Sequence, residues 1–444
     1  MSGRRRRALL VVENESVPHD RRVLLEARTL VEAGWDVTVV CPRKPATAPA
    51  RERMEGIDVV RFGLREADDG VVDFVVEYAL ALVKIGWHAL RLRARGRIDV
   101  VHLSNPPDVL VAVGAPLRLT GAALVFDHHD LAPEVWIGRD GAEGGLVHRA
   151  LLLAERLSMR LADVVISTNE SYRRLAMSRG GRAAEDVIVV RNGPVSSELV
   201  PVDPDLAPPA THPHLLGYIG TMGPQDGVDH LIRALAHIVH DRGRTDVGAV
   251  LVGDGSELDG LRRLTRELGL DERVTFTGRV PHAEVARHLA RVDVCVSPDP
   301  SSPLNDRSTM IKTLEYLALA KPIVAFDLTE TRVSAADCAL YATPDDVIEL
   351  GDLALELIDD PERARKLGEA GRRRLEDELG WDRSAPRLLA AYDRALDNRS
   401  AGLLGRRRRW TRSPTRSNRS RGPRPRWRRH SIAAATKPIS SAAL

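Results

Sequence analysis

Short apolar runs recur along this chain and alternate with segments of helix length. The runs "ALLVV" (8–12) and "DVTVVC" (36–41) flank a segment, 20–33, with the pattern of a helix. Similar runs follow at 57–62, 99–104, 122–127, 163–168 and 186–191. Apolar strands that alternate with helices predict a parallel sheet with helices on both faces.

The alternation is interrupted at residues 192–214, a stretch dense in Pro and polar residues that we interpret as a linker. The pattern then restarts at "LLGYIG" (215–220) and continues to "PIVAFD" (322–327). A chain of 444 residues is also too long for one ordinary core. We therefore predict two α/β domains of similar size. The cleft between them, at the carboxyl ends of strands, is the natural ligand site.

The cysteines and the N-terminal residues indicate a cytoplasmic protein. Cys41, Cys295 and Cys338 stand far apart and form no CxxC pair, which argues against a disulfide framework or a zinc site. Only five apolar residues lie between the basic start and Glu13, too few for a signal peptide. No unbroken apolar run reaches the length of about 18 residues that a membrane span needs.

Positive charge is concentrated at the C-terminus. Residues 401–444 contain twelve Arg, one Lys and no acid, and the whole chain has a net charge of +3. The remaining residues, 1–400, therefore have a net charge of −10. We interpret the tail as disordered, because it has many Pro, Ser and Gly and no helical or strand period. It could bind an anionic membrane or nucleic acid, or it could be a nonessential extension.

Residues 71–95 form a second basic segment, amphipathic and ending in several arginines. Such a helix can lie on a membrane surface. The alternative is an ordinary domain helix with a solvated basic end.

The stretch "NDRSTMIKTLEYLALAKPIVA" (305–325) reads as a loop, a helix and a buried strand. Ser308, Lys312 and Glu315 share one helix face. Ser308 or Asp306 can cap the helix, and the amides of residues 308–310 would then face an anion. Lys312 adds a charge for a phosphate, and the Glu315 carboxylate suits a ribose diol. This pattern describes a nucleotide diphosphate site, although a capped surface helix with a Lys312–Glu315 ion pair has the same spacing.

A polar cluster follows another predicted strand, in "VFDHHDLAPE" (125–134). Asp127, His128, His129 and Asp130 should lie at the cleft, because strand ends in such sheets point there. A His and Asp cluster could bind metal, but no second cluster at ligand spacing supports that. A His and an Asp that cap a turn are the simpler alternative.

The sequence resembles the family 4 retaining glycosyltransferases across residues 8–396. The motifs that show this resemblance are "GYIGTMGPQDGVDHLIRAL", "VLVGDGSELDGLRRL", "VTFTGRVPHAEVARHLARVDVCVSP", "MIKTLEYLALAKPIVA", "PHDRRVLLEARTLVEAGWDVTVVCP", "VFDHHDLAPE" and "VRNGP". The resemblance implies the GT-B fold, in which two Rossmann-like domains face each other across a cleft. It also implies sugar transfer from a nucleotide sugar, without a metal ion or other cofactor.

Two motifs depart from the family pattern. Glu315 matches the second Glu of the family's Glu-x7-Glu motif, but Arg307 stands where the first is expected. Gln225 and Asp226 lie near the position of a usual phosphate-binding Lys. We therefore expect Lys312 and Arg307 to supply positive charge. "NDRST" and "GPQDGVD" resemble a subgroup with the same replacements.

The resemblance implies a division of the chain and a set of site residues. The segments are an acceptor-side domain 1–195, a linker 196–214, a donor-binding domain 215–378, a helix 379–398 that crosses back to the first domain, and the basic tail 399–444. The catalytic residues are His129 and Asp130. The donor-binding residues are Glu315, Lys312, Arg307, Ser308, Thr309, Met310, Gly253, Gly255, Arg279 and Val280. Acceptor or phosphate contacts are Arg21, Arg22 and Asn192, although an N-cap at Asp20 is the simpler interpretation of that stretch.

The expected function is retaining transfer of a sugar from a UDP- or GDP-linked donor to a glycan, lipid-linked or other cell-surface acceptor in bacterial polysaccharide synthesis. The rivals are a nucleotide-sugar epimerase of the same fold and a decayed transferase that only binds nucleotide. We expect no nucleic-acid partner. Residues 71–95 or 401–444 would hold the enzyme at the inner face of the membrane.

Overall fold

The computed structural model describes residues 4–64, 71–138 and 141–410. The first sheet has eight strands in the order β3-β4-β2-β1-β5-β6-β7-β8. They are β1 Arg7–Val11, β2 Asp36–Pro42, β3 Arg51–Met54, β4 Ile57–Phe62, β5 Val100–Ser104, β6 Ala123–His128, β7 Val164–Ser167 and β8 Val187–Val189. All neighbours pair in parallel except β3, which runs antiparallel to β4.

The second sheet has six parallel strands in the order β11-β10-β9-β12-β13-β14. They are β9 His214–Ile219, β10 Val247–Val252, β11 Val274–Gly278, β12 Val294–Ser297, β13 Ile323–Phe326 and β14 Ala339–Ala342. The central strands of both sheets are buried on both faces, which explains why their sequences are continuously apolar.

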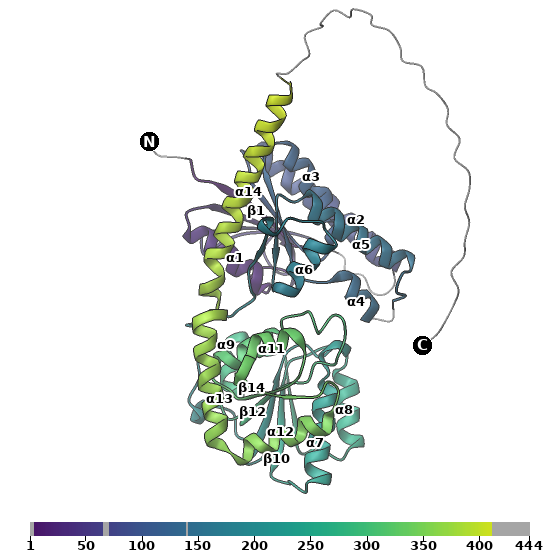
Figure 1. The fold of residues 1–444 in the computed structure, drawn as a ribbon, viewed down its shortest axis with the longest axis vertical. Coiled ribbons are helices and arrows are strands. Elements are labelled where there is room, and N and C mark those ends of the chain that lie inside the picture. Colours follow the sequence, from purple (N-terminus) through teal and green to yellow (C-terminus); the bar gives the residue numbers. More distant parts are fainter. Residues whose placement is uncertain (1–3, 65–70, 139–140, 411–444) are drawn as a thin grey trace, which may run out of the picture. The chain divides into compact units, whose positions relative to one another are not determined.

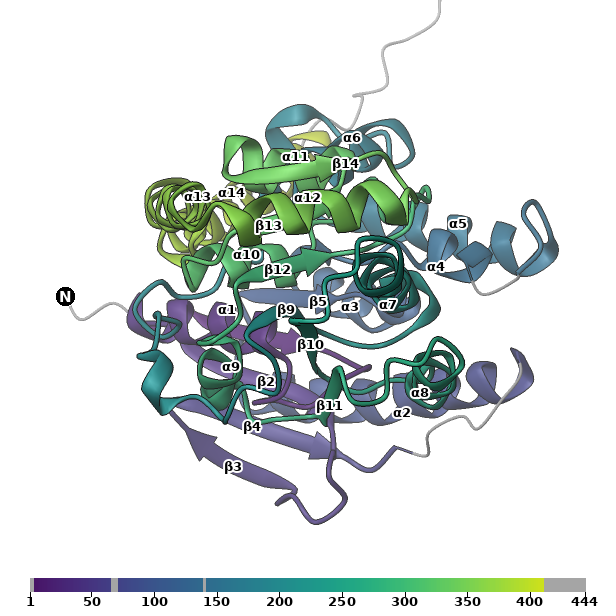
Figure 2. The same ribbon diagram turned by 90° about the horizontal axis from the view of Figure 1, so that it is seen from below.

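Helices cover both faces of each sheet (Figure 1; Figure 2). Around the first sheet lie α1 Arg21–Glu32, α2 Val71–Ala94, α3 Val111–Leu119, α4 Ala132–Gly138, α5 Leu146–Leu161, α6 Glu170–Ser178 and α14 Trp381–Trp410. Around the second lie α7 Val228–Ala236, α8 Leu258–Glu267, α9 His282–Leu289, α10 Ile311–Ala318, α11 Thr329–Ala335, α12 Val347–Asp359 and α13 Pro361–Arg374. Short helical turns are η1 Asp108–Leu110, η2 Ala184–Asp186, η3 Pro204–Leu206, η4 Pro224–Asp226, η5 His237–Asp241, η6 Ala336–Cys338 and η7 Leu375–Leu379.

Each sheet has its own hydrophobic core on each face. On the first sheet, α1 and α14 pack into one core, and α2, α3 and α5 pack into the other. On the second, α7 and α12 share one core, and α9 and α10 share the other. The predicted α/β class with two parallel-sheet domains is confirmed.

Helix α14 packs against the first sheet although it follows the second in the chain. Leu388 and Tyr392 are buried in the core that also contains residues of α1. The indole Nε1 of Trp381 donates to Thr29 Oγ1 at 3.0 Å. Together these contacts fasten the first half of α14 to the first sheet.

The structure corrects the predicted tail. Residues 399–410 were expected to be disordered, but α14 continues to Trp410. This part is rich in Ala, Leu and Arg, which favour helix, and the first proline after Pro386 is Pro414. The rest of the predicted tail, 411–444, lies outside the described residues. Within the described residues, none of the helices combines the length and the apolar character that a membrane span requires.

Candidate functional site

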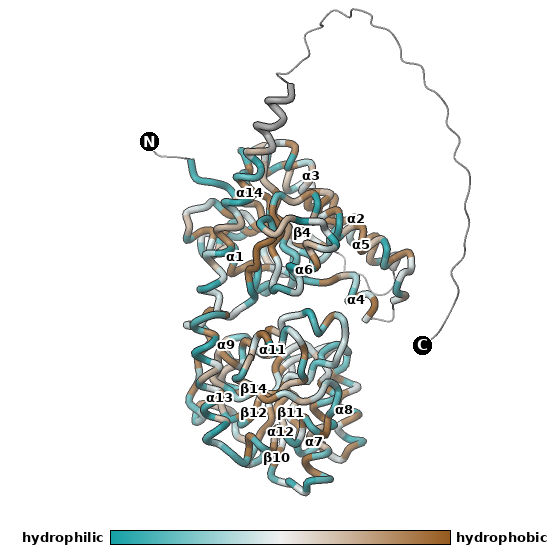
Figure 3. The backbone as a smooth tube through the Cα atoms, in the orientation of Figure 1, coloured by the Kyte–Doolittle hydropathy of each residue, from teal (hydrophilic) through white to brown (hydrophobic). Residues whose placement is uncertain are grey.

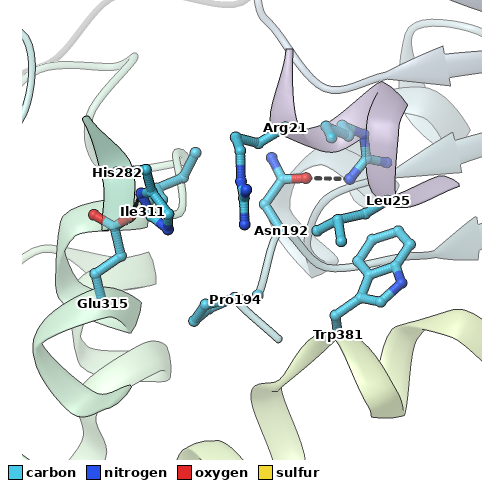
Figure 4. A pocket seen from close by; sticks show the side chains of 10 residues that line it. Arg21, Leu25, Asn192, Pro194, His282, Ile311, Glu315 and Trp381 are labelled. Atoms are coloured by element: carbon cyan, nitrogen blue, oxygen red, sulfur yellow. Dashed lines mark hydrogen bonds and ion pairs between the residues drawn. The ribbon is translucent and has the colours of Figure 1, made fainter. Parts of the chain in front are cut away.

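A cavity of about 110 Å³ lies between α1 of the first sheet and α9 and α10 of the second. Its lining residues are Arg21, Arg22, Leu25, Asn192, Gly193, Pro194, His282, Ile311, Glu315 and Trp381. Figure 4 shows Arg21 and Asn192 on one side and His282 and Glu315 on the other, with the Arg21 side chain extending between them. The cavity therefore brings a cation and a carboxylate from distant parts of the sequence to one space.

Helix α1 places two arginines at the site. Asp20 is its N-cap, and its carboxylate accepts from the Val23 amide at 2.9 Å, which confirms the predicted cap. Arg21 is partly exposed and pairs with Glu198 at 3.1 Å. Arg22, one position on, is buried. The cap thus fixes the turn that carries both arginines, and both line the cavity.

Arg22 and His129 converge on one carboxylate, Asp127, at the end of β6. Two guanidinium nitrogens of Arg22 lie 2.6 Å from the two Asp127 oxygens, and Nδ1 of His129 lies 2.9 Å from Oδ2. Burial alone would raise the pKa of Asp127, but Arg22 and His129 hold it well below its usual range. Burial alone would lower the pKa of His129, but the Asp127 charge raises it. The His129 Nδ1–H therefore donates to Asp127, which leaves Nε2 as the nitrogen that can face a ligand.

Asn105 fixes the backbone that carries His129. Its Oδ1 accepts from the amides of His129 and Asp130 at 2.9 and 3.1 Å, and its Nδ2 donates to the Asp130 carbonyl at 2.8 Å. The Asp130 carboxylate accepts from the Leu131 amide at 2.8 Å. Asp130 therefore stabilises the turn, as the simpler alternative described, and its catalytic role stays a prediction.

Beside Arg22 and Asp127 lies a buried cluster of polar side chains that the sequence analysis did not predict. His102 Nδ1 lies 2.9 Å from the Tyr392 hydroxyl of α14, and its Nε2 lies 3.4 Å from Glu26 Oε2. Burial and the Asp127 charge raise the pKa of Glu26 to about 7. Arg22 lies 3.5 Å from Glu26 and 2.6 Å from Asp127.

Glu26, His102 and Asp127 offer metal-ligand atoms within 4.8 Å of one another. The Arg22 guanidinium already occupies the bidentate face of Asp127 and lies beside Glu26. A second cation at this position would be repelled, so the cluster is better described as an ion-pair network.

Glu315 forms the opposite wall of the cavity, one turn into α10. Among the described residues, its closest ion-pair partner is His282, whose Nδ1 lies 3.7 Å from Oε1. Burial raises the pKa of Glu315 to about 7, although the charges of Arg21 and Lys312 act to lower it. Burial and the Arg21 charge lower the pKa of His282. Glu315 is thus a largely enclosed carboxylate, 13% exposed, whose hydrogen-bonding capacity is largely unused by the protein.

Lys312 does not line this cavity. Its Nζ lies 2.5 Å from Asp299 and 3.3 Å from Asp226, and it sits 5.1 Å from the centre of the Tyr218 ring. Two carboxylates therefore compensate its charge. A phosphate-binding role for Lys312 stays a prediction that this geometry does not favour, and its predicted alternative pairing with Glu315 is wrong.

The predicted cap of α10 is also wrong. The N-cap is Met310, which makes no side-chain cap bond. Ser308 Oγ instead donates to the Leu304 carbonyl at 2.8 Å, and Asp306 accepts from the Thr329 amide at 2.9 Å. The amides of Ile311 and Lys312 nevertheless have no intrahelical partner, because they begin the helix, whereas the Thr313 amide donates to the Met310 carbonyl at 3.1 Å.

The loop before α10 contacts helix α6 of the first sheet. Asn169 Nδ2 donates to the Arg307 carbonyl at 2.8 Å and to Thr309 Oγ1 at 3.0 Å. The Tyr172 hydroxyl lies 3.0 Å from Ser308 Oγ. These bonds orient the loop by way of its backbone and its small hydroxyl side chains.

The Arg307 guanidinium points away from the Glu315 cavity. It donates to the Pro303 carbonyl at 2.9 Å and lies 3.7 Å from Glu134, which itself pairs with Arg179. The structure therefore brings Arg21, Arg22, Asn192 and Glu315 together and leaves Arg307 and Lys312 outside that group.

Gly253 and Gly255 allow two loops of the second sheet to touch. A Cβ at Gly253 would lie 1.8 Å from the Gly220 carbonyl oxygen, and one at Gly255 would lie 2.4 Å from that of Met222. The two glycines are thus needed because the loops of the protein itself approach each other closely here. A role of Gly253 and Gly255 toward a ligand stays a prediction. Arg279 is exposed after β11, and Val280 packs partly against the core under α9.

Sequence reasoning missed several cavity residues. Leu25, His282, Ile311 and Trp381 belong to four different helices. The available signal was weak: Leu25, His282 and Ile311 lie inside family motifs, and Gly193 and Pro194 belong to "VRNGP", but no motif marks them as cavity residues. Nothing in the local pattern of Trp381 connects it with α1.

Family comparisons match both halves of the chain. Residues 19–193 match the family described as "Glycosyl transferase 4-like domain". Residues 213–360 match the family described as "Glycosyl transferases group 1". The two matched regions contain the site residues on both sides of the cavity, from Arg21 to Glu315.

Curated relatives are similar over most of their length. A 2-deoxystreptamine glucosyltransferase of Streptomyces kanamyceticus is 25% identical over 393 residues, covering 84% of this chain and 98% of that protein. A D-inositol 3-phosphate glycosyltransferase of Catenulispora acidiphila is 29% identical over 400 residues, covering 84% and 90%.

Solved structures share the fold. A sucrose-phosphate synthase from Thermosynechococcus elongatus superposes with a TM-score of 0.71 at 19% identity, covering 92% of this chain and 100% of that one. Anabaena HepE, in complex with UDP and glucose, gives a TM-score of 0.67 at 18% identity, covering 87% and 99%. The two family matches, the relatives and the common architecture agree that the chain is a glycosyltransferase of GT-B fold, with a glycosyl transferase 4-like domain followed by a group 1 domain.

Proposed function

We propose that this enzyme transfers a hexose from a UDP- or GDP-linked donor to a glycan, lipid-linked or other cell-surface acceptor, with retention at the anomeric carbon and without a metal ion or other cofactor. The relatives support the donor class, since HepE was solved with UDP and with UDP-glucose. We place the enzyme in the cytoplasm, at the inner face of the membrane.

The observation that carries this proposal is the Glu315 carboxylate in the cavity. Its side chain is only 13% exposed, and its closest ion-pair partner among the described residues, His282, lies 3.7 Å away. A largely enclosed carboxylate without a hydrogen bond to the protein keeps acceptor capacity that a ligand can use. A ribose diol does so, because one carboxylate can accept from two adjacent hydroxyls.

The rest of the site suits a diphosphate leaving group. The first amides of α10 and the positive end of its dipole favour an anion. Arg21 adds a cation inside the cavity. These groups would stabilise the charge that develops on the departing diphosphate.

His129 would contact the donor sugar through Nε2, because Nδ1 is held by Asp127. We propose that the acceptor attacks from the face that the diphosphate leaves. The acceptor's proton then passes to the leaving phosphate oxygen, so that no protein nucleophile is required.

A melting-temperature panel tests the donor site. Wild type, Glu315→Ala and the control Glu284→Ala, an exposed carboxylate on α9, would be heated with UDP, GDP, ADP or dTDP. A ligand at about 100 times its dissociation constant adds roughly 2.7 kcal/mol of stability. We expect one nucleotide to stabilise wild type and Glu284→Ala but not Glu315→Ala. If every nucleotide acts equally on all three proteins, the ribose role of Glu315 is wrong.

A further inference from the structure

Exposed hydrophobic side chains are concentrated on one helical layer of the first sheet. Of the 17 exposed large hydrophobic side chains among the described residues, 12 lie on α2, α3 and α5. They are Phe74, Val75, Val76, Leu80, Val83, Trp87, Leu90, Leu119, Leu146, Leu153, Leu157 and Leu161. We call these side chains the outer helical face; Figure 3 shows brown, hydrophobic stretches along α2 and α5. Patches of this kind mark interaction sites rather than ordinary surface.

Helix α2 has two apolar faces. Ala81, Ile85 and Ala89 are buried against the sheet. The opposite side exposes Val76, Leu80, Val83, Trp87 and Leu90, which are spaced by four and three residues alternately. Val83 is 71% exposed and Trp87 is 60% exposed. An apolar stripe with helical spacing has no function in the fold itself, so it indicates an external apolar partner.

A basic cavity of about 600 Å³ lies beside this stripe, next to the carboxyl ends of β2 and β4. Its charged or titratable lining residues are Arg43, Arg51, Arg61, Lys84 and His88. None of the lining residues is acidic. Val83 and Trp87 of the exposed stripe also line it. The cavity and the stripe are therefore one continuous surface.

Most cations of this cavity have no acidic partner. Among the described residues, no acid forms an ion pair with Arg43, Arg51 or Lys84. Arg61, in contrast, is buried and satisfied within the protein, by Glu52 at 2.8 Å and by two backbone carbonyls. Burial, followed by the charges of Arg51 and Arg91, lowers the pKa of His88. A cavity lined by unpaired cations and by no acid has a positive potential, which suits an oxyanion such as a phosphate.

We propose that the outer helical face docks onto an anionic phospholipid membrane and that a lipid phosphate occupies the basic cavity. The apolar stripe of α2 then lies at the boundary between headgroups and acyl chains, where Trp side chains are favoured. Lys84 and Arg43 supply the electrostatic attraction to anionic lipid. This docking deepens the membrane location given in the proposed function, on which it rests, and it can be tested without any sugar transfer.

A second copy of the chain is a less suitable occupant. In a two-fold symmetric contact the same patch meets itself, so the cations around the cavity would approach one another. A lipid surface supplies both the apolar and the anionic partner at once.

Vesicle sedimentation without any donor tests the docking. The full chain would be mixed with vesicles of phosphatidylcholine alone or of phosphatidylcholine with phosphatidylglycerol. We expect tighter binding to the anionic vesicles. Arg43→Gln with Lys84→Gln should weaken that binding about tenfold or more, since each cation near an anionic surface contributes about 1 kcal/mol. Val83→Asp with Leu153→Asp should abolish binding to both vesicle types.

Matched controls lie on the second sheet's helices. Lys366→Gln removes a cation of 67% exposure, and Ile348→Asp places an acid at a hydrophobic position of 54% exposure. Both should bind anionic vesicles like wild type. Binding that is equal for the two vesicle types, or unchanged in the Arg43 and Lys84 variant, would overturn the phosphate site. A dimer in light scattering that Val83→Asp converts to a monomer would show that a second copy covers this face, and would overturn the membrane proposal.

Discussion

Asp127 is the residue on which the first half of the site depends, because it pairs with the buried Arg22 guanidinium and with the His129 ring. Replacing it by Asn leaves the Arg22 guanidinium without its bidentate partner. Removing one partner of a buried ion pair typically costs about 3–5 kcal/mol. We therefore expect Asp127→Asn to lower the melting temperature strongly and to lower the pKa of His129, since Asp127 is the charge that raises it.

The matched control is Asp393→Asn. Asp393 pairs with Arg6 at 2.7 Å, but both side chains are more than half exposed. An exposed pair contributes about 0–1 kcal/mol, so this variant should melt close to wild type. Equal melting shifts for the two variants would show that Asp127 does not hold a buried network.

Glu315 should make nucleotide binding depend on pH. Its pKa of about 7 means that the carboxyl is largely protonated below pH 7 and ionised above it. Only the ionised form accepts from both ribose hydroxyls. Nucleotide affinity should therefore rise as the pH increases from 6 to 8, by up to about tenfold per pH unit below the pKa, and then level off.

Glu315→Gln provides the comparison for this titration. Gln at position 315 cannot ionise. The nucleotide phosphate ionises in the same way with either protein, so its effect cancels in the ratio of the two affinities. The ratio of the two affinities, measured by calorimetry, should increase with pH. A ratio that is constant between pH 6 and pH 8 would contradict the assignment of Glu315.

At the scale of elements, two loops of the second sheet meet through glycine. Gly253 has φ +145° and no room for a Cβ, since Gly220 O would lie 1.8 Å away. We expect Gly253→Ala to destabilise the protein by at least about 3 kcal/mol. Gly86→Ala, in open space within α2, should be neutral or stabilising by up to about 1 kcal/mol. Chemical denaturation of both variants checks this, and similar midpoints would refute the close contact.

The sequence predicted all the central strands and half of the edge strands. The apolar runs located twelve of the strands to within a few residues. The two missed strands, β3, "RERM", and β14, "ALYA", are both edge strands and only four residues long, although the edge strands β8 and β11 were located. Edge strands need not be continuously apolar, and β3 is mostly exposed and antiparallel.

The candidate site was predictable only where a role depends on local chemistry. Glu315, Arg21, Arg22 and Asn192 could be chosen from motifs, and they do share a cavity. The ion pairs of Lys312 could not be predicted, because its partners Asp299 and Asp226 lie 13 and 86 positions away on other segments. Spacing along a helix reports which face a side chain shares, but not which distant acid packs against that face.

At the scale of the whole molecule, the candidate site is assembled from chain segments that are far apart in sequence. Arg21 follows the first strand, Asn192 follows the eighth, and Glu315 lies beyond the twelfth. The two family matches, over residues 19–193 and 213–360, include the segments on both sides of the cavity. The central claim is therefore that both halves act together on a nucleotide sugar, and not that either half merely binds nucleotide.

Product analysis by NMR tests that claim most directly. The purified full chain would be incubated with UDP- or GDP-linked hexoses and a bacterial lipid extract as the source of acceptor, with Glu315→Ala as the control. We predict that one donor loses its sugar, that the free nucleotide diphosphate accumulates, and that the new glycoside keeps the donor's anomeric configuration. Conversion of the donor into an isomeric nucleotide sugar would identify an epimerase. A donor that binds but stays intact would identify a decayed transferase, and either result would contradict the account.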